Sequence, residues 1–159
     1  MIDFHPLTLL IRFTGVFMKA TSHNTFTGKI IAITSGPITD EVAIQLETGE
    51  IIYSQISHSS TLEMGLELGQ QATAFIKATE TLLFTDVEGY KISSRNQFTG
   101  KIVKLNRGFV TAEVLVETST GVEINATVTL AGVNRLKLDR GHIATATFKA
   151  SSVVLAVKA

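Results

Sequence analysis

The stretch SRNQFTGKI, Ser94–Ile102, repeats the stretch SHNTFTGKI, Ser22–Ile30, with two of the nine residues exchanged. When the chain is aligned with itself at an offset of 72 residues, the match continues without a gap. From Thr21 to Asp86 there are 66 positions, and 22 of them are identical to the residue 72 positions later. One-third identity in an unbroken register indicates an internal duplication. Since only two copies exist, the repeat predicts tandem domains rather than a solenoid.

Each repeat has the pattern of five short β-strands. Stretches rich in Ile and Val, such as TGKIIAIT and EVAIQLE, alternate as strands do, and the Gly-containing turn at 48–50 predicts a hairpin. The polar, leucine-containing stretch HSSTLEMGLELG predicts one or two helical turns that close at Gly69, and at Gly141 in the second copy, with Ser60 and Glu63 as a capping box. Five strands with one short helix between strands three and four is the plan of an OB-like barrel. We therefore expect an all-β chain of two tandem five-stranded OB-like Greek-key barrels.

The repeat boundaries suggest the division into domains. We place a first domain at 18–88 and a second at 89–159, joined through the short stretch VEGYK, Val87–Lys91. Residues 1–17 precede a second methionine, Met18, at the start of the first repeat. We interpret them as an N-terminal extension, either an added tail or the product of an upstream start codon, outside the folded domains.

Composition excludes several classes of function. The chain has no Cys, which removes thiolate catalysis and Cys-based zinc sites. Its formal net charge is +0, with no Trp and only 2 Tyr, so it lacks the basic surface and the aromatic rings of a nucleic-acid binder. No apolar run reaches the roughly 18 residues that span a bilayer, and the first 17 residues form a poor signal peptide. Because repeats of about 70 residues are near the lower limit for one core, we expect a homo-oligomer.

Nothing in the sequence has the pattern of a catalytic site. No Ser-His-Asp order recurs in both repeats, and the histidines are not kept: His58 corresponds to Leu130 and His142 to Gln70. No His, Asp or Glu cluster has metal-ligand spacing, and no nucleotide-binding glycine pattern occurs. We therefore expect no enzyme, no organic cofactor and no direct cation site.

Both repeats instead keep a set of polar donors in register, at the start of the first strand and after the fourth. The set consists of Thr21, Ser22, His23, Asn24, Lys77, Ala78 and Thr79 in the first repeat, and Ser93, Ser94, Arg95, Asn96, Lys149, Ala150 and Ser151 in the second. Hydroxyls, amides, cations and free N–H groups suit a small oxyanion, which only accepts hydrogen bonds. The same residue types also serve turns and strand entries, so both interpretations stay open from the residues alone.

The phrase ISSRNQFTGKI, followed about 50 residues later by FKASSVVLAV, resembles the Mop domain, which is the TOBE-type domain of the molbindins. The resemblance extends from Lys19 to the C-terminus, twice over, and is to the two-domain molbindins, the ModG-like proteins. It implies OB-like barrels, a trimer, and sites for molybdate, and usually tungstate, between barrels of neighbouring subunits. It also implies cytoplasmic storage or homeostasis of molybdenum, with no nucleic acid or membrane as partner.

The resemblance carries over position by position. In the second repeat the matching residues are Ser93, Arg95, Asn96, Lys149 and Ser151, and Arg135 aligns with an arginine that some members place near the anion. In the first repeat Thr21 replaces the serine, His23 replaces the arginine, and Glu63 stands where Arg135 stands. Exchanging an arginine for a carboxylate lowers the attraction for a dianion, so we expect the repeats to contribute unequally. We also expect sites that use His23 to weaken as the pH rises past about 6.5.

Two other functions remain open from the sequence. One is a structural or regulatory interaction module that does not bind anions, which the departures at His23 and Glu63 favour. The other is nucleic-acid binding through an OB-like face, which the neutral charge and scarce aromatic residues disfavour.

Overall fold

The computed structural model describes residues 24–159. The prediction for residues 1–17, and the candidate residues Thr21, Ser22 and His23, lie outside the described residues. The first repeat forms β1 (Asn24–Ser35), β2 (Thr39–Leu46), β3 (Ile51–Ser57), α2 (His58–Met64), β4 (Gln71–Ile76), η2 (Ala78–Glu80) and β5 (Leu82–Phe84). The second repeat forms β6 (Asn96–Arg107), β7 (Thr111–Thr118), β8 (Glu123–Thr129), α3 (Leu130–Leu136), β9 (Ile143–Phe148), η3 (Ala150–Ser152) and β10 (Val154–Ala156).

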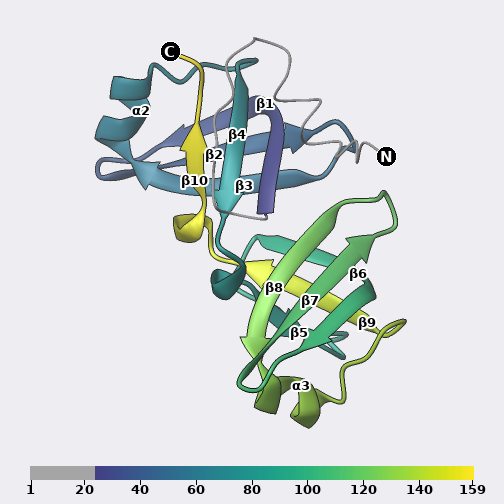
Figure 1. Cartoon of the computed structure of the whole chain (residues 1–159). Helices are drawn as coiled ribbons and strands as arrows, with labels where there is room; N and C mark the ends of the chain where they lie inside the picture. Colours follow the sequence, from purple (N-terminus) through teal and green to yellow (C-terminus); the bar gives the residue numbers. More distant parts are fainter. Residues whose placement is uncertain (1–23) are drawn as a thin grey trace.

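The strands form two five-stranded sheets, in the orders β10-β4-β1-β2-β3 and β5-β9-β6-β7-β8. Every pairing is antiparallel, and each sheet curls into a barrel, one above the other in Figure 1. The all-β class, the tandem OB-like barrels and the short helix between strands three and four are confirmed.

The fifth strand of each sheet comes from the other repeat. β10, at the end of the second repeat, pairs with β4, and β5, at the end of the first repeat, pairs with β9. In Figure 1 the yellow β10 lies in the upper barrel, whose other strands come from the first repeat. The sequence-based expectation that each repeat closes its own barrel is therefore wrong for this strand. The repeats exchange their last strands, which joins the two barrels through main-chain ladders.

The exchange also closes each barrel at its open edge. η3, which precedes β10, lies against β3, and η2 lies against β8 in the same way. In the first barrel the hydroxyl of Ser54, which is 0% exposed, donates to the carbonyl of Val153 at 2.8 Å. Ala126 stands at the equivalent place in β8 and has no hydroxyl, so the second barrel lacks this bond.

Glycines mark the closest approach between strands. A Cβ on Gly28 would collide with the main chain of Gln45, and one on Gly100 would collide with that of Glu117. The ladder register shifts just beyond, between Ile30 and Ala32 in the first barrel. These glycines therefore permit a close backbone approach next to a bulge.

The short helices begin and end earlier than the sequence suggested. Ser57, not Ser60, is the N-cap of α2, because its hydroxyl accepts from the N–H of Ser60 at 3.1 Å. The helix closes at Gly65, which has a left-handed φ of 60°. Gly69 instead forms the next turn, where its N–H donates to Ile30 O at 2.8 Å. The capping box was wrong because Ser57 already caps the helix three residues before Ser60. The closures at Gly69 and Gly141 were wrong because Gly65 and Lys137, four residues before each, adopt the left-handed conformation that ends α2 and α3.

The interior is a continuous apolar core that extends over both barrels. Phe98 of β6 and Phe148 of β9 stack with ring centroids 5.7 Å apart. Among residues 24–159, no helix is long and apolar enough to cross a membrane.

Candidate functional site

The pairing of β6 with β9 brings together the two donor segments of the second repeat, Ser93–Asn96 and Lys149–Ser151. Asn96, at the start of β6, lies opposite Phe148, at the end of β9, so Ser93–Arg95 lie beside Lys149. The hydroxyl of Ser94 donates to Phe148 O at 2.8 Å and fixes this adjacency. The side chains of Ser93, Arg95, Lys149 and Ser151 are exposed. One end of this barrel therefore presents two cations and two hydroxyls to solvent.

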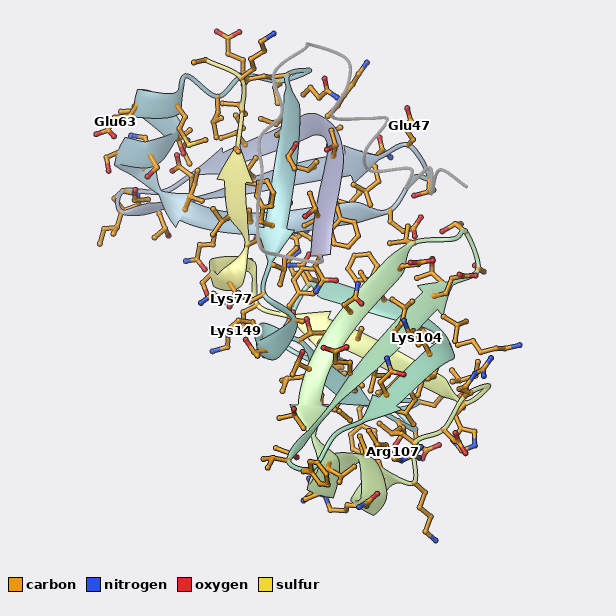
Figure 2. The ribbon with its side chains drawn as sticks, in the orientation of Figure 1. Glu47, Glu63, Lys77, Lys104, Arg107 and Lys149 are labelled. Atoms are coloured by element: carbon orange, nitrogen blue, oxygen red, sulfur yellow. The ribbon has the colours of Figure 1, made fainter. Side chains whose placement is uncertain are left out.

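The first repeat builds the same arrangement with its own residues. Asn24 lies opposite Ile76, and Lys77, Ala78 and Thr79 follow directly. The two ends meet at the junction of the barrels, where Ser152 Oγ of η3 lies 3.5 Å from Glu80 Oε2 of η2. Figure 2 shows Lys77 and Lys149 both at this junction. We call Ser93, Arg95, Lys149, Ser151, Lys77 and Thr79 the junction donors.

The two asparagines have a different role, because their amides are held within the chain. Asn96 is 0% exposed; its Nδ2 donates to Tyr53 O, and its Oδ1 accepts from Tyr53 N, both at 2.8 Å. Asn24 makes the equivalent pair with the main chain of Asn125, at 2.7 Å in both directions. Each asparagine thus joins its own repeat to the edge of the other, and both are positioned by the fold rather than open to solvent.

Arg95 also reaches across to the first repeat. Its guanidinium forms an ion pair with Glu41 of β2, and its Cζ lies 3.8 Å from the ring centroid of Tyr53 in β3. The side chain of Arg95 remains 55% exposed and that of Glu41 33% exposed. No sequence pattern indicates this contact, since 54 residues separate the two partners.

Arg135 is not brought to the junction. It is exposed on α3, which lies at the end of the lower barrel away from the junction (Figure 1). Its counterpart Glu63 lies on α2 of the upper barrel, where Figure 2 labels it. Within one chain, therefore, Arg135 and the junction donors form separate groups.

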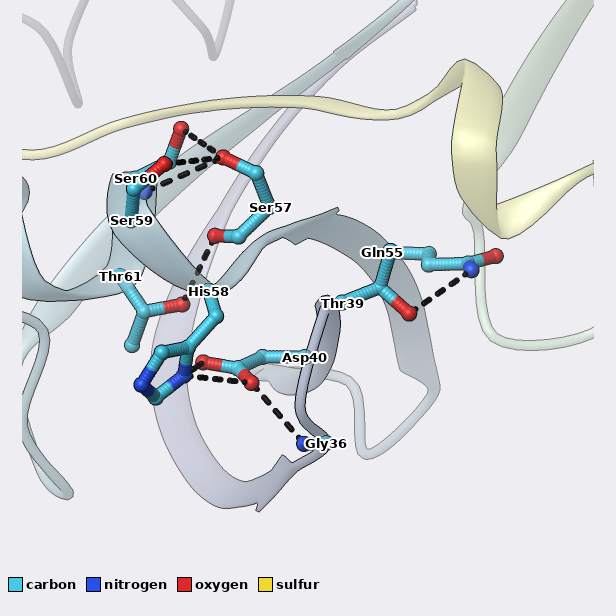
Figure 3. A network of polar contacts seen from close by, with 9 residues as sticks. All are labelled: Gly36, Thr39, Asp40, Gln55, Ser57, His58, Ser59, Ser60 and Thr61. Atoms are coloured by element: carbon cyan, nitrogen blue, oxygen red, sulfur yellow. Dashed lines mark hydrogen bonds and ion pairs between the residues drawn. The ribbon is translucent and has the colours of Figure 1, made fainter.

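A polar network that the sequence did not predict ties the β1–β2 turn to α2 (Figure 3). Asp40 is 1% exposed, and its carboxylate accepts from His58 Nδ1 at 3.0 Å and from the N–H of Gly36 at 3.1 Å. A hydrogen bond from Thr61, followed by those from His58 and Gly36, holds the pKa of Asp40 below its ordinary value although burial opposes this. The only sequence signal was a strand-entry Asp that becomes Ala112 in the other repeat.

The junction donors line neither of two surface hollows found within residues 24–159. One hollow is lined by residues of the β5–β6 segment with Thr99 and Thr145. The other lies between the β2–β3 and β7–β8 turns, with Glu50, Thr118 and Thr120. In one chain the donors therefore lie on an open surface rather than in an enclosed site.

Comparison with known proteins gives three consistent matches. The TOBE domain family matches residues 21–83 and again residues 92–155. The molybdenum transport protein ModE of Herbaspirillum seropedicae is 34% identical over 141 residues, which is 89% of this chain and 52% of that protein. The molybdenum-pterin-binding protein MopA of Rhodobacter capsulatus is 32% identical over 88% of this chain and 53% of its own length. The chain spans about half the length of these curated relatives.

A solved structure matches the whole arrangement. It is a crystal structure of the cytoplasmic molybdate-binding protein ModG with molybdate bound, and it superposes with a TM-score of 0.85 at 36% identity. The match covers 89% of this chain and 100% of that one.

Proposed function

This chain belongs to the TOBE domain family as a two-domain molbindin, and on that premise we propose that it binds molybdate and stores it in the cytoplasm. The observation that carries the proposal is the adjacency of Ser93–Arg95 and Lys149–Ser151 at one end of the β6–β9 pair. The two segments are far apart in sequence, and they match the two sequence motifs of the family.

The chemistry of the junction donors fits a tetrahedral dianion. Molybdate accepts hydrogen bonds through four oxygens and donates none. Hydroxyls of Ser93 and Ser151, with the charged groups of Arg95 and Lys149, supply donors of the right kind. Lys77 and Thr79 of the first repeat add a further cation and hydroxyl. Binding forms and breaks no covalent bond in this scheme, so we propose capture without catalysis.

We assign Asn24 and Asn96 a positioning role toward the same anion. Their amides are committed to the main chain of the other repeat, so they hold the strand starts in place while the exposed neighbours bind. Ser94 has a similar role, since its hydroxyl donates to Phe148 O. Ala78 and Ala150 contribute main-chain N–H groups at the start of η2 and η3.

We further propose that each site is completed by a neighbouring subunit. The junction donors form an open surface, and a dianion held strongly against water needs donors on more than one side. A second chain supplies them in a homo-oligomer, for which we favour a trimer. Arg135, remote from the junction in its own chain, is then a donor to a neighbour's site. Tungstate, a tetrahedral dianion of nearly the same size, fits the same chemistry.

Isothermal titration with molybdate tests the proposal, with sulfate as the competing tetrahedral dianion. We expect several molybdates bound per oligomer and little heat from sulfate. The variant Lys149→Gln removes one charge-assisted contact and lowers the affinity about tenfold or more. Lys101→Gln, an exposed lysine on β6, is the matched control and leaves the affinity unchanged. Equal weakening by both variants contradicts a specific role for the junction.

One observation favours the alternative of an interaction module without anion binding. Asn24, Asn96 and Arg95, three of the residues that the family phrase contributes, are all paired inside the chain. If the folded, oligomeric protein binds no molybdate, these residues serve the assembly of the barrels instead. The interaction module then replaces the proposal.

A further inference from the structure

Arg95 leaves its own repeat and is held by two side chains of the other. It stands one residue before β6, yet its guanidinium pairs with the carboxylate of Glu41 on β2 and covers the ring of Tyr53 on β3. The main-chain N–H and C=O of Tyr53 are both bonded to the Asn96 amide, which fixes the backbone that carries this ring. The backbone of Arg95 therefore lies next to Lys149, while its guanidinium is bonded to the carboxylate of Glu41.

We propose that Glu41 is a positioning residue that holds Arg95 on the Tyr53 ring until the bound oxyanion replaces it. This inference rests on the proposed function, since it concerns the same junction. Glu41 does not bind the anion. It competes with the anion for the N–H groups of Arg95 and thereby lowers the affinity of the site.

The competition follows from the geometry of a guanidinium. Its N–H groups lie in one plane and turn together, so the guanidinium is oriented by the Nη1 bond to Glu41, and the N–H in that bond cannot donate to the anion at the same time. A dianion at the junction also meets repulsion from the charge of Glu41 as long as the carboxylate stays close. Because Arg95 is 55% and Glu41 33% exposed, water screens their ion pair, so an oxyanion can displace it.

The repeats differ at this point. The position equivalent to Tyr53 is Asn125, which offers no ring. The position equivalent to Glu41 is Glu113, which is exposed and forms no ion pair with any of residues 24–159. The same charge can thus be removed at two equivalent places, of which, among residues 24–159, only Glu41 contacts an arginine. This makes Glu113→Gln a matched control for Glu41→Gln.

The first experiment measures molybdate affinity by titration calorimetry in Glu41→Gln, Arg95→Gln and the double variant. We expect Glu41→Gln to bind up to about fivefold more tightly than the unaltered chain, the range of a partly exposed ion pair. In the Arg95→Gln background the same change has no effect, because no guanidinium is left to release. Glu113→Gln leaves the affinity within the error of the unaltered chain.

The second experiment uses the fluorescence of Tyr53, the ring that Arg95 covers, to detect movement of Arg95. The chain has no Trp and only 2 Tyr, and the other one, Tyr90, is 78% exposed. In a Tyr90→Phe background, Tyr53 is the only fluorophore of this kind. We expect its emission to change when molybdate binds, and Glu41→Gln without anion to show part of the same change. Arg95→Gln abolishes the response to molybdate.

The outcomes separate this inference from the proposed function. If no protein of the series binds molybdate, both are overturned. If the unaltered chain binds molybdate but Glu41→Gln binds no more tightly, the positioning role is overturned and the function stands. If Glu41→Gln tightens binding equally with and without Arg95, Glu41 acts only through its charge at a distance, which also overturns the positioning role.

Discussion

Asn96 and Tyr53 are joined by two hydrogen bonds of 2.8 Å, so that one side-chain amide imitates a neighbouring strand at the edge of the other barrel. Asn24 repeats the arrangement with Asn125, where both bonds are 2.7 Å. Both asparagines are 0% exposed. The Asn of the duplicated phrase is therefore an inter-barrel contact in both repeats, and it holds the neighbouring donors at the junction.

Replacing Asn96 by alanine should destabilise the whole chain. The change leaves the N–H and C=O of Tyr53 without partners in a part-buried place, which costs about 2–4 kcal/mol. Urea denaturation followed by circular dichroism measures the loss. Asn106→Ala, an exposed asparagine on the same strand, is the matched control and should change the free energy of unfolding by less than about 0.5 kcal/mol. Similar losses in both variants would show that the bonds to Tyr53 add nothing.

Gly100→Ala should destabilise the second barrel by about 2–3 kcal/mol, because the added Cβ would collide with the main chain of Glu117. A main-chain atom in a ladder cannot rotate away as a side chain can. Lys101→Ala, the next residue on the strand and exposed, serves as the control. An alanine at 100 that leaves the denaturation midpoint unchanged would mean that the strands separate easily at this point.

The stability of the chain should fall on acidification through the buried Asp40. Its hydrogen bonds lower its pKa in the folded state below the ordinary value of 3.8, so folding favours the charged carboxylate. This contribution is complete above pH 3.8 and is lost as the pH falls through the lower, folded-state pKa. Thermal unfolding of the unaltered chain and of Asp40→Asn from pH 7 to pH 2.5 measures it. We expect the difference between their melting temperatures to shrink at the acidic end, and a constant difference would contradict the assignment.

Sequence reasoning predicted the fold well because its evidence was local. Strand periodicity and the turn at Gly49 are properties of neighbouring residues. The duplication applies the same local pattern twice, and the observed elements repeat at the 72-residue offset, from Asn24–Ser35 to Asn96–Arg107. The exchange of β5 and β10 was not predictable in this way. Leu82–Phe84 has the same pattern whichever barrel it joins, and a main-chain ladder does not select among partners by side-chain identity.

The sequence identified residues of the candidate site, but it did not identify the contacts that these residues make. Retention of Lys77 and Lys149 in register marked the junction, and the structure brings both to it (Figure 2). The sequence could not show that Arg95 rests on Tyr53 and Glu41, because those contacts join different repeats. The contact between Asp40 and His58 was missed because a contact made in one repeat alone leaves no trace in a comparison of the two.

Because the last strands are exchanged, a substitution in the last strand of one repeat should lower the local stability of the other repeat's sheet. Leu155 of β10 is 8% exposed and lies opposite Ala74 of β4, while Leu83 of β5 lies opposite Ala146 of β9. Leu155→Ala loses about 2–3 kcal/mol of packing and loosens the edge that protects β4. Amide hydrogen exchange should therefore speed up in β4 of the first repeat for Leu155→Ala, and in β9 of the second for Leu83→Ala. If each variant instead affected only the sheet of its own repeat, the last strands would not be exchanged in solution, and the two barrels would be joined by the short linker and by side-chain contacts such as those of Asn96 and Arg95.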